Sequence, residues 1–238
     1  AGLYLDPAGF RSSAGSMSLS HYVVLRQGSR PTSQIEIKKS RFLGYASRTA
    51  DEDQARDFLA EVRRAHREAR HVCHAFVVEP DRRIQRSSDD GEPAGTAGTP
   101  ILKAIIARQT SPGRTELSDV TVAVVRYFGG IKLGAGGLVQ AYSEAAAAVL
   151  DNARLVGRQR MRLIGLALPI AEAARTESRL RAQGCRVESV DYQADEVQLR
   201  IAVADEPEDL RAAMTSLAAI TAGGAKPAIG EQIWRDLD

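Results

Sequence analysis

The alternation of apolar and polar positions predicts a chain of mixed helices and strands. Apolar residues at alternate positions over 35–47 indicate one or two antiparallel strands. Apolar residues at helical spacing predict a helix over 51–70, with acidic residues in its first turn and arginines near its end. A nearly continuous apolar run over 119–128 is typical of a central strand covered on both faces. The other elements expected in this part are a hairpin over 72–79 and 82–87 and helices over 99–107 and 138–153.

From residue 161 the pattern changes to a compact series of short elements. Strands are expected at 163–169, 186–193, 196–203 and 228–234, and helices at 171–183 and 207–217. This β-α-β-β-α-β order is that of a ferredoxin-like domain. We therefore expect an α+β protein with a vector-derived or disordered tail over 1–16, an N-terminal domain over 17–154, a linker over 155–160 and a C-terminal domain over 161–238.

Composition and charge narrow the class of protein. With 44% apolar and 26% charged residues, the 238-residue chain has the composition of a globular protein of one or two domains. Its apolar runs are far shorter than the roughly 20 residues that cross a bilayer, so we expect no membrane association. The two cysteines fall in different predicted domains, which favours a reducing cytoplasm over a disulfide framework.

Charge is distributed unevenly between the two predicted domains. Residues 1–160 contain 23 basic and 17 acidic residues, which gives a net charge of +6. Residues 161–238 contain 9 basic and 13 acidic residues, which gives a net charge of −4. The first part is therefore the better candidate for contacting a polyanion.

A glycine-rich stretch, RYFGGIKLGAGGLVQAY (126–142), joins the central strand to the following helix. It lacks the Gly-Lys-Ser/Thr ending of a Walker A loop, and Val139 stands where a dinucleotide fingerprint needs glycine. The backbone N–H groups and dipole at the helix N-terminus could still hold an anion. The alternative is that these glycines serve the backbone, by permitting positive φ and close packing. The candidate phosphate contacts here are Gly134, Gly136 and Gly137.

A second glycine-rich loop, DDGEPAGTAGTP (89–100), carries three carboxylates: Asp89, Asp90 and Glu92. Carboxylates repel a bare phosphate but accept one bridged by Mg²⁺. Magnesium is therefore the candidate metal cofactor at this loop. The alternative is an acidic turn whose aspartates cap neighbouring backbone groups. We expect Thr99, followed by a proline, to cap the next helix.

Two further groups of side chains could bind or react. On a strand, His71 and Cys73 share one face, either as a packed polar pair or as part of a metal or nucleophilic site. A zinc site would need three or four ligands. Basic side chains near Phe42, Tyr45, Tyr127 and Phe128 could contact phosphates while these rings stack on bases. The basic candidates are Lys38, Lys39, Arg41, Arg126 and Lys132.

Four separated motifs together resemble the signature blocks of the IMPACT/YigZ family. They are KKSRF (38–42), HVCHAF (71–76), DDGEPAGTAGTPIL (89–102) and VVRYFGGIKLGAGGLVQAY (124–142). The resemblance is strong over 33–153, and 161–234 resembles the C-terminal domain of bacterial YigZ-type members. It implies an N-terminal fold like domain 2 of ribosomal protein S five and a C-terminal domain similar to the last domain of elongation factor G.

For the bacterial group, the resemblance implies a proposed association with nucleic acid or the ribosome. Eukaryotic relatives regulate translation by restraining a starvation-responsive kinase, but they carry a different extra domain, so we do not carry that role over. We expect a cytoplasmic, non-enzymatic binding protein with RNA, the ribosome or another protein as partner, acting in translation or stress regulation. One alternative is a metal-dependent enzyme or binder of a small phosphate-containing ligand at the two glycine-rich loops. Another is a protein–protein interaction module.

Overall fold

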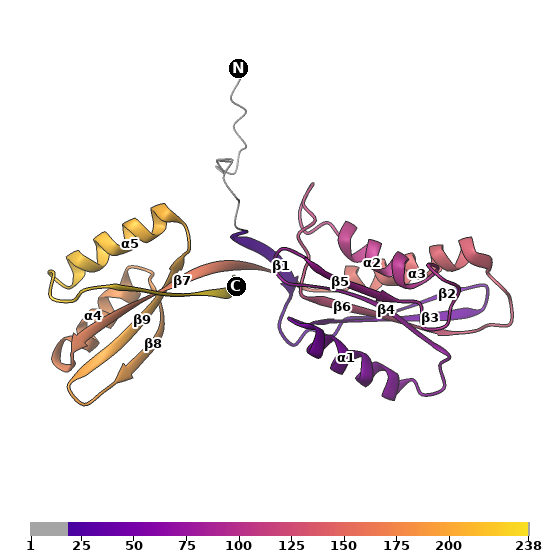
Figure 1. The fold of residues 1–238 in the computed structure, drawn as a ribbon, viewed down its shortest axis with the longest axis horizontal. Helices are drawn as coiled ribbons and strands as arrows, with labels where there is room; N and C mark the ends of the chain where they lie inside the picture. Colours follow the sequence, from indigo (N-terminus) through magenta and orange to yellow (C-terminus); the bar gives the residue numbers. More distant parts are fainter. Residues whose placement is uncertain (1–18, 238) are drawn as a thin grey trace, which may run out of the picture.

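The computed structural model describes residues 19–237, which form two five-stranded antiparallel sheets with helices packed against them (Figure 1). The architecture is therefore mixed α+β, as predicted; the tail predicted over 1–16 lies outside the described residues. The elements are β1 (His21–Leu25), β2 (Thr32–Ile37), β3 (Ser40–Arg48), α1 (Glu52–Ala65), β4 (His71–Val78), β5 (Ile84–Ser88), α2 (Gly98–Ala107), β6 (Val120–Tyr127), α3 (Gly134–Asp151), β7 (Leu155–Pro169), α4 (Ile170–Ala182), β8 (Arg186–Tyr192), β9 (Glu196–Ala204), α5 (Pro207–Ile220) and β10 (Ala228–Leu237). None of these helices is long and apolar enough to cross a membrane.

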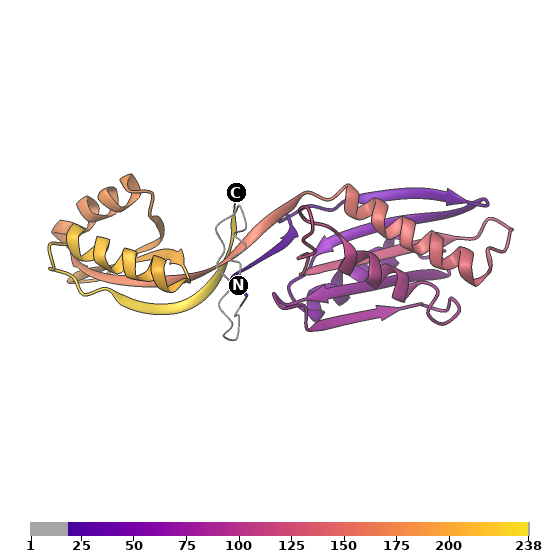
Figure 2. The same cartoon turned by 90° about the horizontal axis from the view of Figure 1, so that it is seen from above.

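The first sheet has the strand order β2-β3-β6-β4-β5, so the apolar run predicted to be central does lie at its centre. Helices α2 and α3 cover one face and α1 covers the other, as the two views in Figures 1 and 2 show. Ile101 and Tyr142 are fully buried on the first face, and Phe58 packs with Val125 on the second. Burial on both faces explains why β6 is apolar at nearly every position.

The second sheet is built around β7, which is 15 residues long. Strands β10, β7, β9 and β8 lie side by side in that order, and their elements follow one another as β-α-β-β-α-β. Helices α4 and α5 contribute Leu180 and Leu217 to one buried core with Ile164, Leu199 and Ile201 of the strands.

Residues 155–160, which the sequence predicts to be a linker, are instead the first part of β7. The apolar patch at 22–25 becomes strand β1 and pairs with this segment, with Tyr22 opposite Arg158 and Leu25 opposite Leu155. Strand β10 pairs along the other edge. The arginines of this segment meet carboxylates, as Arg160 does with Asp205 at 2.8 Å.

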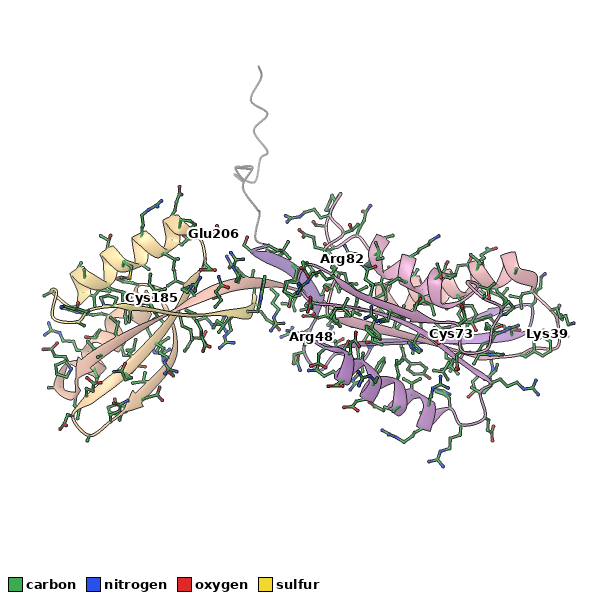
Figure 3. The ribbon with its side chains drawn as sticks, viewed as in Figure 1. Lys39, Arg48, Cys73, Arg82, Cys185 and Glu206 are labelled. Atoms are coloured by element: carbon green, nitrogen blue, oxygen red, sulfur yellow. The ribbon has the colours of Figure 1, made fainter. Side chains whose placement is uncertain are left out.

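Polar contacts fix the joint between the two sheets, close to the described end of the chain (Figure 1). Both terminal nitrogens of Arg48 donate to the Asp236 carboxylate, at 2.6 and 3.0 Å. Figure 3 labels Arg48 where the lobes meet. The Tyr22 hydroxyl donates to buried Asp119 at 2.6 Å, and the Tyr22 ring meets Trp234 edge to face at 4.8 Å. The molecule is thus elongated, and its two lobes are joined through paired strands.

Candidate functional site

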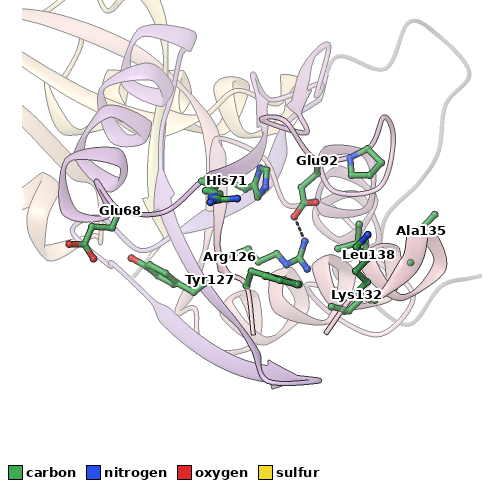
Figure 4. A pocket seen from close by; sticks show the side chains of 13 residues that line it. Glu68, His71, Glu92, Arg126, Tyr127, Lys132, Ala135 and Leu138 are labelled. Atoms are coloured by element: carbon green, nitrogen blue, oxygen red, sulfur yellow. Dashed lines mark hydrogen bonds and ion pairs between the residues drawn. The ribbon is translucent and has the colours of Figure 1, made fainter. Parts of the chain in front are cut away.

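A cleft of about 600 Å³ opens at one end of the first sheet, where the two glycine-rich loops meet (Figure 4). Glu92 and Pro93 line it from the glycine-rich loop over 89–100, and residues 132–135 line it from the glycine-rich stretch over 126–142. His71 lines it from the start of β4, and Arg70 lines it from the segment just before that strand. The structure therefore places both loops on one cleft.

A buried ion pair lies at the floor of this cleft. Nη1 of Arg126 donates to Oε1 of Glu92 at 2.7 Å, and the two side chains are only 9% and 4% exposed. The Tyr142 hydroxyl donates to the same carboxylate oxygen at 2.8 Å. Nε of Arg126 is buried without a hydrogen-bond partner among residues 19–237. Arg126 thus lines the cleft, while its unpaired Nε is enclosed by protein.

Two aromatic rings flank this guanidinium. The ring centroids of Phe42 and Phe128 each lie 5.6 Å from Cζ of Arg126. Phe42 is buried in the core, whereas Phe128 is 58% exposed and lines the cleft. Such contacts favour the cation, and the exposed ring offers an aromatic face beside it.

Helix α3 begins at Gly134, four residues before the sequence predicts, so the glycine run forms its first turn. Within the described part of the chain, no side chain caps this end. Gly134 has φ +75°, which favours glycine, but Gly136 is open to solvent, with nothing within 4 Å of where a Cβ would lie. The first N–H groups of a helix lack intrahelical partners, so α3 presents free donors and its positive dipole end at the cleft.

The second helix N-terminus is already occupied by a carboxylate of the protein. Asp89 accepts hydrogen bonds from the backbone N–H groups of Gly95, Ala97 and Gly98, at 2.8, 2.9 and 2.8 Å. Burial opposes ionisation of Asp89, but these three donors outweigh it and lower the pKa. Asp89 thus caps α2 in the place predicted for Thr99, in agreement with the capping alternative.

The other two acidic residues of this loop also have protein partners. Asp90 accepts from Arg63 and from the backbone N–H of Val72, both at 2.7 Å, while Glu92 holds Arg126. Across residues 19–237, no group of three or more His, Cys, Asp or Glu side chains is placed to hold a metal ion.

His71 and Cys73 both contact this loop, as their shared face predicts. Nδ1 of His71 lies 2.8 Å from the carbonyl oxygen of Asp90, and the Cys73 thiol donates to the carbonyl oxygen of Asp89 at 3.0 Å. Burial raises the pKa of Cys73 to about 12. The thiol is therefore protonated near neutral pH and is not activated as a nucleophile.

The basic candidates divide into two neighbouring groups. Arg126 and Lys132 line the cleft, whereas Lys38 and Lys39 do not. These two lysines form the β2–β3 turn, with φ 47° and 64°, so the stretch predicted as one or two strands over 35–47 is divided between two strands here. The positive φ values at both positions are those of the turns that close two-residue hairpins.

The β2–β3 turn packs directly against the loop that follows β6. A Cβ on Gly129 would lie 2.0 Å from the carbonyl group of Lys39, so only glycine fits there. The Gly129 N–H donates to Oγ of Ser40 at 3.1 Å. Arg41 is exposed, with its guanidinium 5.1 Å from the Tyr127 ring, which itself lines the cleft. Lys38, Lys39 and Arg41 therefore lie beside the cleft and not inside it.

Glu68 and Arg70 also line the cleft, although the sequence predicts that both belong to a helix over 51–70, from which Arg63, Arg64, Arg67 and Arg70 were further candidates for phosphate contact. Helix α1 ends at Ala65, and the ring of His66 lies 2.7 and 2.9 Å from the hydroxyls of Tyr45 and Tyr127. The chain turns there, so 68–70 reach the cleft instead of continuing the helix. The local sequence gave little signal of this end, because the arginines near it suit a helix C-terminus equally well.

Residues 38–150, which include every residue that lines the cleft, match the Impact N-terminal domain model. The IMPACT family member YvyE of Bacillus subtilis is 36% identical to this chain over 67% of this chain and 70% of its own length. The IMPACT family member YigZ of Escherichia coli is 47% identical over 45% of this chain and 50% of its own length. Among solved structures, a hypothetical protein matches with a TM-score of 0.62 and 30% identity, covering 90% of this chain and 99% of its own.

Proposed function

The chain belongs to the IMPACT family, and we propose that it is a non-enzymatic protein that binds single-stranded RNA, free or on the ribosome, by holding phosphate in the cleft. One observation carries this proposal: a buried arginine and the uncapped N-terminus of α3 border the same cleft. Backbone donors, a helix dipole and an arginine are the groups that bind phosphate in proteins.

The neighbouring side chains support a polynucleotide as the source of the phosphate. Arg70 and Lys132 are exposed on the cleft, and the basic turn at Lys38 and Lys39 continues beyond it. Phe128 offers an exposed ring on which a base could stack. Stacking needs an unpaired base, so this combination favours a single strand over a duplex.

We also propose the finer assignment of the two lobes. Residues 161–238 would form a ferredoxin-like domain similar to the last domain of elongation factor G, and 17–154 a domain like the second domain of ribosomal protein S five. The order β10-β7-β9-β8 with two helices on one core supports the first assignment. Both likenesses to translation proteins suit a protein that acts near the ribosome in the cytoplasm.

Binding of labelled single-stranded RNA, followed by fluorescence anisotropy over a salt series, tests the proposal. We expect affinity to fall with rising salt. In a plot of the logarithm of affinity against the logarithm of salt concentration, each phosphate contact should steepen the slope by about 0.7. The double variant Arg70→Ala/Lys132→Ala removes two cleft cations and should weaken binding and flatten the slope. The control Arg179→Ala/Lys226→Ala removes the same charge from the second lobe and should leave both unchanged. Equal effects of the two variants, or no binding at low salt, would contradict the proposal.

A further inference from the structure

We infer that the cleft takes the terminal phosphate monoester of a nucleotide at a strand end, in preference to an internal phosphodiester. This inference rests on the proposed function and concerns which phosphate of the RNA enters. The relevant feature is the depth of the arginine: its side chain is 9% exposed and lies at the floor, beneath the exposed ring of Phe128.

The position of Arg126 favours a group that ends the strand. A monoester presents three free oxygens, whereas an internal diester carries only two and is tethered to sugars on both sides. A group tethered on one side can enter a cleft further than one tethered on both. Glu92 and Pro93 line one part of the cleft and residues 133–135 another, on either side of the group that would reach Arg126.

The charges of the lining also suit a monoester. Three cationic side chains, Arg70, Arg126 and Lys132, and two carboxylates, Glu68 and Glu92, line the cleft, so without counting His71 the lining has a net charge of +1. The helix end adds roughly half a positive charge. A monoester carries about −1.5 to −2 at neutral pH, against −1 for a diester. It therefore neutralises the cleft more completely.

The volume of the cleft suits a single nucleotide. About 600 Å³ lies within the range of roughly 300–1,000 Å³ that small-molecule sites occupy. With the phosphate at the α3 N-terminus, the attached base would lie toward Phe128, the exposed ring of the lining.

The test compares three RNAs of one sequence with the intact chain: one with a 5′-phosphate, one with a 3′-phosphate and one with hydroxyls at both ends. We expect one phosphorylated RNA to bind about tenfold more tightly than the unphosphorylated RNA, the effect of about one additional charge-assisted contact. Lys132→Ala, in the cleft, should abolish this ratio. Lys39→Ala, in the turn beside it, should weaken all three RNAs alike and keep the ratio.

The outcomes separate this inference from the proposed function. Equal affinity for the three RNAs would overturn the inference and leave RNA binding standing. Failure of all three RNAs to bind would overturn both. Preference for one end, lost in Lys132→Ala and kept in Lys39→Ala, would support both and identify which end is recognised.

Discussion

At the scale of single residues, the ion pair between Glu92 and Arg126 links stability to the cleft. Both side chains are almost fully buried, so removing one leaves the other charge without its partner. We expect Glu92→Ala to lower the free energy of unfolding by about 3 kcal/mol, measured by urea denaturation. Glu144→Ala, on the exposed side of α3, should change it by less than about 0.5 kcal/mol. Similar small losses for both variants would mean that the pair is dispensable.

Asp89 gives a prediction about pH. Its folded-state pKa is lowered, so its stabilising contribution is present above the unfolded value of about 3.9 and is lost as pH falls through the lower folded value. Asp89→Asn should destabilise the protein by about 1–2 kcal/mol at pH 7, because the amide replaces a charged cap. The gap between the variant and the wild type should narrow below about pH 4, as thermal unfolding across a pH series can show. A constant gap down to pH 2 would exclude this role.

The sequence identified most chemically relevant residues but not which way each one points. Arg126, Lys132 and Gly134 do line one cleft. The role of Asp89 depends on the loop path, in which Asp90 and Gly91 have φ 44° and 85°. No residue pattern specifies that path, so the sequence favoured capping but left metal binding open.

At the scale of elements, periodicity predicted every helix and most strands because each buries one face or both. Periodicity did not predict β1 or the strand over 155–160, because the strands that pair with these segments lie far away in the sequence. Strand β1 is five residues long, and its partner lies far along the chain. The start of α3 was also missed, because glycine usually marks a loop and here forms the first helical turn.

The continuous strand over 155–169 predicts slow amide exchange where a linker would exchange quickly. Residues 157–159 are paired on both edges, with β1 and with β10. We expect hydrogen–deuterium exchange at these amides to be as slow as at 163–166 in the same strand. The exposed turn at 111–114 is the matched fast-exchanging control. Rapid exchange at 157–159 would show that the strand opens at the joint.

At the scale of the whole molecule, Arg48 and Asp236 connect the two lobes. Their side chains are 11% and 30% exposed, so solvent screens the pair only in part. A double-mutant cycle with Arg48→Ala and Asp236→Ala should give a coupling energy of about 1–2 kcal/mol in thermal unfolding. Additive effects of the two changes would show that this ion pair does not help to hold the lobes together.

The pairing of β1 with β7 also bears on the order in which the protein folds as it is made. Tyr22 and Arg158, opposite each other in these strands, are 136 residues apart in the chain. Val24 and Leu25 are fully buried in the finished protein, yet their partner strand is synthesised only after the first sheet is complete. Until that strand emerges, the apolar beginning of the chain has an unpaired edge, where a nascent chain is prone to association. Strand β1, synthesised before every other described strand, is thus among the last to find its place.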